Sequence, residues 1–141
     1  IYMKIIFLDF DGVLHPENPA PNQLFSNAYM LDNFLRDYQC QVIVTSSWQF
    51  SPKYQSFLNI LPGFLAKSIT GETQCSFKGN ASRLKEINHY LHMKHLSNID
   101  WVAIDDKSEK FPDNFSQLIL CDSLTGITEK QISILKNWFD H

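Results

Sequence analysis

Residues 5–14, IIFLDFDGVL, constrain the fold more than any other part of the chain. The segment begins with four consecutive apolar residues, which are typical of a strand buried on both faces, as in a parallel sheet covered by helices. Asp9, Asp11 and Gly12 follow this run. Ligand crevices in open α/β sheets lie at the carboxyl ends of strands, so both carboxylates are predicted to lie at such a crevice.

Two acids placed side by side at the end of a buried strand repel each other and lose solvation. A divalent cation is the simplest way to keep Asp9 and Asp11 ionised together. We therefore predict a metal site at this edge of the sheet.

The composition is that of a globular protein. Of the 141 residues, 44% are hydrophobic and 19% charged, so the chain can form a normal core, and its length suits one domain over residues 1–141. The net charge of −3 gives no sign of an extended nucleic-acid-binding surface. No apolar run approaches the length of a transmembrane helix, so no membrane partner is expected.

The three cysteines, Cys40, Cys75 and Cys121, have no paired spacing. We therefore expect free thiols rather than a disulfide framework or a zinc site, and a cytoplasmic location. No secretory signal is recognised, and Ile1 and Tyr2 are expected to be foreign to the natural protein, with Met3 as its start.

Strand-like and helix-like patterns alternate along the chain. Strands are expected at 5–9, 41–46, 64–69, 101–105 and 117–121. Helical spacing of apolar residues covers 31–38, 81–91 and 128–139, and Thr128 with Gln131 forms a capping-box signature. Repeated β-α units predict a five-stranded, mostly parallel sheet with helices on both faces.

Further polar residues follow other predicted strands. Thr45 and Ser46 end the second strand, where hydroxyls and free N–H groups can bind an anion, although helix capping is the alternative role. Asp105 and Asp106 end the fourth strand, and Lys78 and Arg83 precede it. This set predicts a site for a divalent metal and a phosphoryl group.

The order of these motifs resembles that of the haloacid dehalogenase (HAD) superfamily. Asp9-Phe10-Asp11-Gly12-Val13 is similar to its Asp-x-Asp-Gly-Thr/Val motif. A Thr, a cation and an acidic pair then follow in the family's order, at Thr45, at Lys78 or Arg83, and at Asp105-Asp106. The resemblance implies a three-layer αβα, Rossmann-like fold. The spacings leave no room for a cap domain.

The resemblance also implies Mg²⁺-dependent phosphatase chemistry. Asp9 would be the nucleophile that forms an aspartyl phosphate, and Asp11 would protonate the leaving oxygen and then activate water. Mg²⁺ would be held by Asp9, the backbone carbonyl of Asp11, and Asp105, with Asp106 as an alternate ligand or a partner of the ligands. Thr45 and one cation would hold the phosphate, and spacing leaves Lys78 and Arg83 equally eligible.

Four more residues are candidates for substrate binding, namely Gly12, Ser46, His15 and Trp48. For Trp48, a place in the core is favoured over a contact with substrate. An open site of this kind suits a bulky phosphorylated substrate, such as a protein or a nucleic-acid end.

Two other classes of function compete with the phosphatase, a phospho-accepting receiver domain and a catalytically silent HAD-like scaffold. The receiver is disfavoured because its acidic pair and phosphorylated Asp follow a different order, and the scaffold stays open because a fold does not fix a function.

Overall fold

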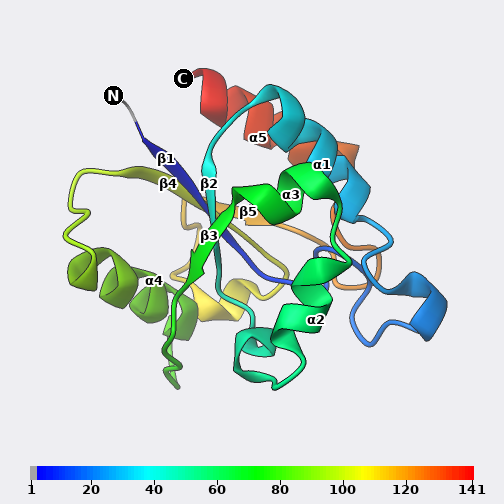
Figure 1. Ribbon diagram of the computed structural model, residues 1–141. Helices are drawn as coiled ribbons and strands as arrows, with labels where there is room; N and C mark the ends of the chain where they lie inside the picture. Colours follow the sequence, from blue (N-terminus) through cyan, green and yellow to red (C-terminus); the bar gives the residue numbers. More distant parts are fainter. Residues whose placement is uncertain (1–2) are drawn as a thin grey trace.

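The computed structural model describes residues 3–141, and the expectation about Ile1 and Tyr2 lies outside this range. Within residues 3–141, five strands form one parallel sheet in the order β3-β2-β1-β4-β5 (Figure 1). The strands are β1 (Lys4–Leu8), β2 (Gln41–Val44), β3 (Ile69–Glu72), β4 (Asp100–Asp105) and β5 (Leu118–Leu120). The predicted αβα architecture is therefore confirmed.

Helices cover both faces of the sheet. The α-helices are α1 (Ala28–Asp37), α2 (Tyr54–Asn59), α3 (Gly63–Ser68), α4 (Ser82–Met93) and α5 (Glu129–Asp140). The short 3-10 helices in the described part of the chain are η1 (Pro21–Gln23), η2 (Ser47–Phe50) and η3 (Ser108–Lys110). Within residues 3–141, no further domain is inserted into the connections between strands, and no helix is long and apolar enough to cross a bilayer.

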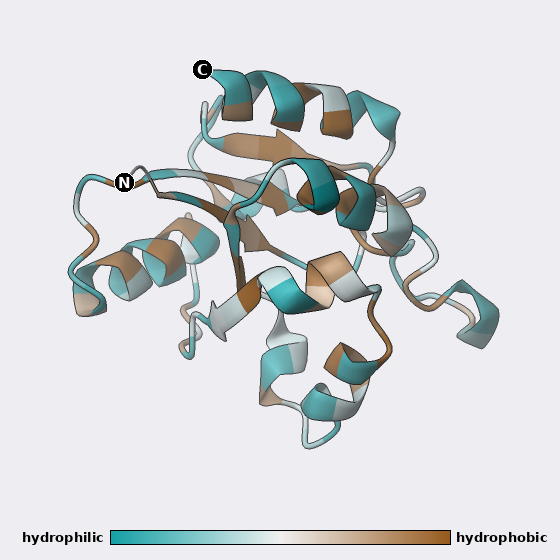
Figure 2. Ribbon diagram, turned by 45° about the horizontal axis from the view of Figure 1, so that its top comes forward, coloured by the Kyte–Doolittle hydropathy of each residue, from teal (hydrophilic) through white to brown (hydrophobic). Residues whose placement is uncertain are grey.

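Alternation of side chains along β1 divides the core into two layers. Ile6 and Leu8 pack in the larger cluster with residues of α1, α3 and α5, whereas Ile5 and Phe7 pack in the smaller one with residues of α4. All four side chains are fully buried. Figure 2 shows the hydrophobic strands between helices whose outer faces are largely hydrophilic. β1 is thus a central strand, as the apolar run predicted.

The predicted strand at 64–69 is wrong, because most of this segment forms helix α3 and β3 begins only at Ile69. Pro62 directly precedes the helix and has extended backbone. The carboxylate of Asp32, from α1, accepts a hydrogen bond of 2.9 Å from the Leu65 N–H in the first turn. A short apolar run does not distinguish a strand from a helix, and here a side chain from another helix caps the N-terminus of α3.

This cap gives a testable prediction for the fold. Asp32→Ala should lower the free energy of unfolding by about 1 kcal/mol, because it removes the acceptor for an N–H at the start of α3. Asp32→Asn keeps an oxygen acceptor and should recover most of the loss. Urea denaturation of both variants measures the difference, with Asn33→Ala, an exposed neighbour on α1, as the control. Equal stability of Asp32→Ala and the unmodified chain would contradict the role of the cap.

Candidate active site

Asp9, Asp105 and Asp106 come together where β1 and β4 end. One carboxylate oxygen from each lies within 4.8 Å of the others. Backbone hydrogen bonds that extend the sheet hold this position, since the Asp9 N–H donates to the Ile104 carbonyl at 3.1 Å. The Asp9 and Asp105 residues are only 6% and 1% exposed. Burial, followed by repulsion from Asp105, raises the pKa of Asp9 well above its usual value, and burial also raises the pKa of Asp105.

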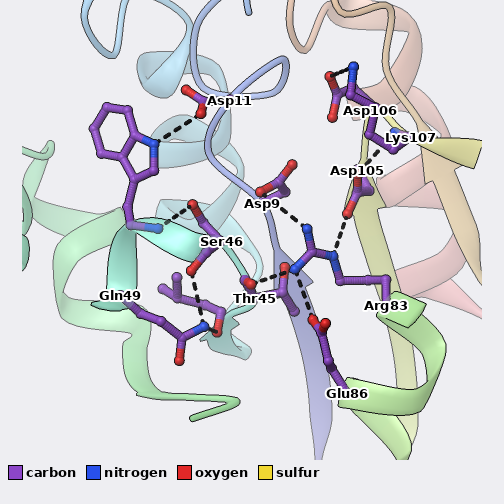
Figure 3. Close-up of polar contacts among 12 residues, drawn as sticks. Asp9, Asp11, Thr45, Ser46, Gln49, Arg83, Glu86, Asp105, Asp106 and Lys107 are labelled. Carbon is purple, nitrogen blue, oxygen red and sulfur yellow. Dashed lines mark hydrogen bonds and ion pairs between the residues drawn. The ribbon is translucent and has the colours of Figure 1, made fainter. Parts of the chain in front are cut away.

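Arg83, in the first turn of α4, lies against this group. Its Nε donates to Asp105 at 3.1 Å, and a terminal nitrogen lies 3.9 Å from Asp9 (Figure 3). The other terminal nitrogen donates to the Thr45 carbonyl oxygen and to Glu86 at 3.0 Å. The guanidinium thus joins the ends of β1, β2 and β4 to α4. Three carboxylates share its single charge, which leaves this edge of the sheet acidic.

A pocket of about 280 Å³ opens over this edge. Its charged lining comprises five acids and three cations among residues 3–141, namely Asp9, Asp11, Glu17, Glu86 and Asp106, with Arg83, Lys107 and Lys110. Acids therefore outnumber cations even before Asp105 is counted. The carboxylates supply hard oxygen ligands, so Asp9, Asp105 and Asp106 fit a divalent metal ion.

Thr45 and Ser46 lie at the end of β2 and both line the pocket. Each residue is at most 3% exposed. The Ser46 hydroxyl accepts a hydrogen bond of 3.2 Å from the Trp48 N–H, so it caps η2 while bordering the pocket. The capping role is therefore confirmed for Ser46, and anion binding at this turn stays a prediction.

Asp11 also lines the pocket, but it is outside the group of three acids. Its side chain is 43% exposed and accepts hydrogen bonds from His15 and Trp48. The bond from His15 is the main cause that lowers the pKa of Asp11, and the bond from Trp48 acts in the same direction. The two acids of the first motif therefore have different environments, since Asp9 is buried among acids and Asp11 is held by ring nitrogens.

Five of the predicted site residues do not line this pocket, namely Gly12, Asp105, Lys78, His15 and Trp48. Lys78 is exposed, outside the pocket lining, and four residues before the start of α4, so Arg83 occupies the place expected for the cation. His15 is 0% exposed, which leaves no surface for the predicted substrate contact. Trp48 packs against Phe10, Phe25 and Phe57, in agreement with its alternative role as a core residue.

The sequence motifs did not predict several residues of the pocket. Glu86 is 5% exposed and accepts from both Arg83 and the Phe77 N–H. Its i,i+3 spacing from Arg83 was the available signal. Lys107 and Lys110 enter from η3 and its N-terminal side, and Phe50 and Phe77 flank the pocket from the segments after β2 and β3. These last four residues lie in loops or short 3-10 helices whose spacing carries no recognisable pattern.

Position 12 must be a glycine because the side chain of Asp106 lies very close to it. Its φ is +74°, and a Cβ built at Gly12 would lie 2.0 Å from Oδ2 of Asp106. Asp106 itself accepts from the Ser123 hydroxyl at 2.7 Å and lies 3.6 Å from the Lys107 ammonium. The absence of a Cβ at Gly12 therefore lets Asp106 pack against the first motif.

Gly12→Ala should displace Asp106 and strain the backbone. We expect a loss of about 1–3 kcal/mol in stability and a divalent metal affinity weaker by about tenfold or more. Thermal melting and calorimetric titration with Mg²⁺ measure the two effects. Gly63→Ala is the matched control, since its Cβ would meet no atom within 4 Å. Unchanged stability and metal affinity in Gly12→Ala would refute this role for the glycine.

Comparison with known families places these residues in context. No curated protein sequence matches the chain. A family model described as "HAD domain in Swiss Army Knife RNA repair proteins" matches residues 5–132, from β1 into α5. The match includes every acid and cation of the pocket described above, and it confirms the resemblance to the HAD superfamily. The chain therefore belongs to this family of HAD domains.

Proposed function

We propose that this protein is a Mg²⁺-dependent phosphohydrolase that acts through an aspartyl phosphate on Asp9. The observation that carries the proposal is the convergence of Asp9, Asp105 and Asp106 beside Arg83, below a pocket that Asp11 and Thr45 also line. Membership of a HAD family supports the same chemistry. A catalytically silent scaffold would have no need of three mutually repelling buried acids at a pocket.

In the proposed reaction Asp9 and Asp11 have different roles. A carboxylate oxygen of Asp9 attacks phosphorus as the bond from phosphorus to the leaving oxygen breaks, and Asp11 gives that oxygen a proton. Asp11 then takes a proton from the water that attacks the aspartyl phosphate, which releases inorganic phosphate and restores Asp9. The residues that would hold Mg²⁺ are Asp9, Asp105, Asp106 and the Asp11 carbonyl. When bound, the ion neutralises charge on the phosphoryl group.

Arg83 is the cation that we assign to this chemistry. Its guanidinium lies between Asp9 and Asp105 and is only 6% exposed, whereas Lys78 is exposed outside the pocket lining. In our proposal Arg83 keeps Asp9 ionised and correctly placed, and Thr45 provides a hydroxyl for the phosphate. Arg83 is also structural, because its removal would leave three buried carboxylates without their partner.

The direct test is Asp9→Asn, assayed for phosphate release from p-nitrophenyl phosphate with Mg²⁺. An amide is not a competent nucleophile, so we expect turnover to fall by about 10³-fold or more. Without metal the variant should be at least as stable as the unmodified chain, because it lacks one buried, repelled carboxylate whose pKa is raised. Thermal melting checks this expectation.

Lys78→Ala is the control for that experiment and should retain turnover. Chelation of Mg²⁺ should abolish activity in both Lys78→Ala and the unmodified chain. Undiminished hydrolysis by Asp9→Asn would overturn the assignment of the nucleophile. Absence of hydrolysis by the unmodified chain on every phosphate ester tested would favour the scaffold function.

For the substrate, we propose a phosphorylated nucleic-acid end. The matched family is described from RNA repair proteins. Two partly exposed aromatic rings, Phe50 at 54% and Phe77 at 40%, flank the pocket. Aromatic rings beside a phosphate site can stack on bases, and each base stacked in this way contributes about 1–3 kcal/mol. The net charge of −3 limits such binding to a few nucleotides.

We therefore expect kcat/KM to be at least tenfold higher for a phosphorylated oligonucleotide end than for a small sugar phosphate, a preference of about 1.4 kcal/mol. Phe50→Ala should reduce this preference by raising KM for the oligonucleotide, while p-nitrophenyl phosphate hydrolysis changes little. Parallel assays with 3′- and 5′-phosphorylated oligonucleotides, phosphopeptides and sugar phosphates measure the preference. A sugar phosphate that proves the better substrate by tenfold would refute the proposal.

A further inference from the structure

Both carboxylate oxygens of Asp11 are engaged by nitrogen donors from outside the catalytic group. His15 Nε2 lies 2.8 Å from Oδ1, and Trp48 Nε1 donates to Oδ2 at 3.0 Å. A carboxylate bound through both oxygens cannot rotate freely about its last bond. The pocket side of Asp11 nevertheless stays open, since 43% of the side chain is exposed. Asp11 is therefore fixed in direction and still accessible to a ligand.

The proton on His15 is fixed in turn by the backbone. The Phe25 N–H donates to Nδ1 of His15 at 3.1 Å. Because Nδ1 is the acceptor, the ring proton of the neutral imidazole is on Nε2, from which it is donated to Asp11. Phe25 has a φ of +56°, a conformation that a bulky residue rarely adopts. Phe25, a residue with uncommon backbone geometry, thus provides the N–H that favours the His15 tautomer with its proton on Nε2.

Aromatic packing holds both donor rings in place. The His15 ring centroid lies 5.3 Å from that of Trp48 and 5.4 Å from that of Phe25. Phe57 also packs against Trp48, with ring centroids 4.7 Å apart. His15 is 0% exposed, so neither solvent nor substrate can compete for its ring. The two donors come from separate segments, the loop after β1 and η2, and Phe57 belongs to α2.

We propose that His15 and Trp48 are positioning residues, which orient the Asp11 carboxyl so that it can deliver a proton to the leaving oxygen of the substrate. The inference rests on the proposed phosphohydrolase function. It predicts a specific dependence on the leaving group, because a good leaving group departs as an anion and needs no proton, whereas a poor one must be protonated as its bond to phosphorus breaks.

The test measures kcat/KM with Mg²⁺ for a series of phosphate monoesters, from p-nitrophenyl phosphate to phenyl phosphate and an alkyl phosphate. Trp48→Phe removes the Nε1 donor while it keeps an aromatic ring. We expect kcat/KM for the alkyl ester to fall at least tenfold more than that for p-nitrophenyl phosphate. His15→Ala should have the same selective effect, and His15→Gln, which retains an N–H donor, should restore part of the lost activity on the alkyl ester.

Phe57→Leu is the matched control, since Phe57 packs against Trp48 without a hydrogen bond to Asp11. It should lower kcat/KM by one common factor across the series. Because His15 is buried, thermal melting checks that its variants fold. If they do not, Trp48→Phe decides the question alone. An equal loss on all esters in Trp48→Phe would overturn the positioning role and leave only a packing role.

Asp11→Asn separates failure of this inference from failure of the proposed function. If Asp11 is the acid, Asp11→Asn loses most activity on the alkyl ester, and adding Trp48→Phe to it causes no further selective loss. A selective loss in Asp11→Asn without one in Trp48→Phe would refute the positioning role and keep the proposed chemistry. Absence of any selective loss in Asp11→Asn would refute the assignment of Asp11 as the acid and, with it, this inference.

Discussion

The buried guanidinium of Arg83 is the interaction on which the candidate site depends. It contacts Asp9 after β1, the carbonyl of Thr45 after β2, Asp105 at the end of β4 and Glu86 one turn along α4. Acids this poorly exposed would be strongly penalised without a cation, because desolvation and mutual repulsion both disfavour their ionised forms. Arg83 therefore makes possible a concentration of carboxylates that a single guanidinium does not fully neutralise. The remaining negative charge is what suits the pocket to a metal ion.

The pocket has two differently built sides. On one side, Asp9, Asp105 and Asp106 are buried and held by charged or hydroxyl partners. On the other, Asp11 is held by ring nitrogens of His15 and Trp48. Burial raises the pKa of Asp9, whereas hydrogen bonds lower that of Asp11. Two acids separated by one residue are thus placed in different environments, one buried among charged groups and the other held in direction by ring N–H donors.

Much of the fold could be predicted from local patterns. The apolar runs of β1, β2 and β4 are buried on both faces of the sheet, and such runs can be recognised from sequence. Thr128 and Gln131 do form a cap, since the Gln131 side chain accepts from the Thr128 N–H at 2.8 Å. Prediction failed at α3, where the deciding hydrogen bond comes from Asp32, 33 positions away in the sequence from Leu65.

By itself, the sequence determined that Asp9, Thr45 and Asp105 meet at one edge of the sheet, because each lies at or directly after the end of a strand and neighbouring parallel strands end at the same edge. Only the tertiary structure decided that Arg83 rather than Lys78 joins them, because α4 begins at Ser82 and leaves Lys78 in the exposed loop before it. It likewise decided that His15 is buried against Asp11. Strand ends are fixed by local pattern, whereas the direction in which a loop side chain points depends on packing between segments far apart in the chain.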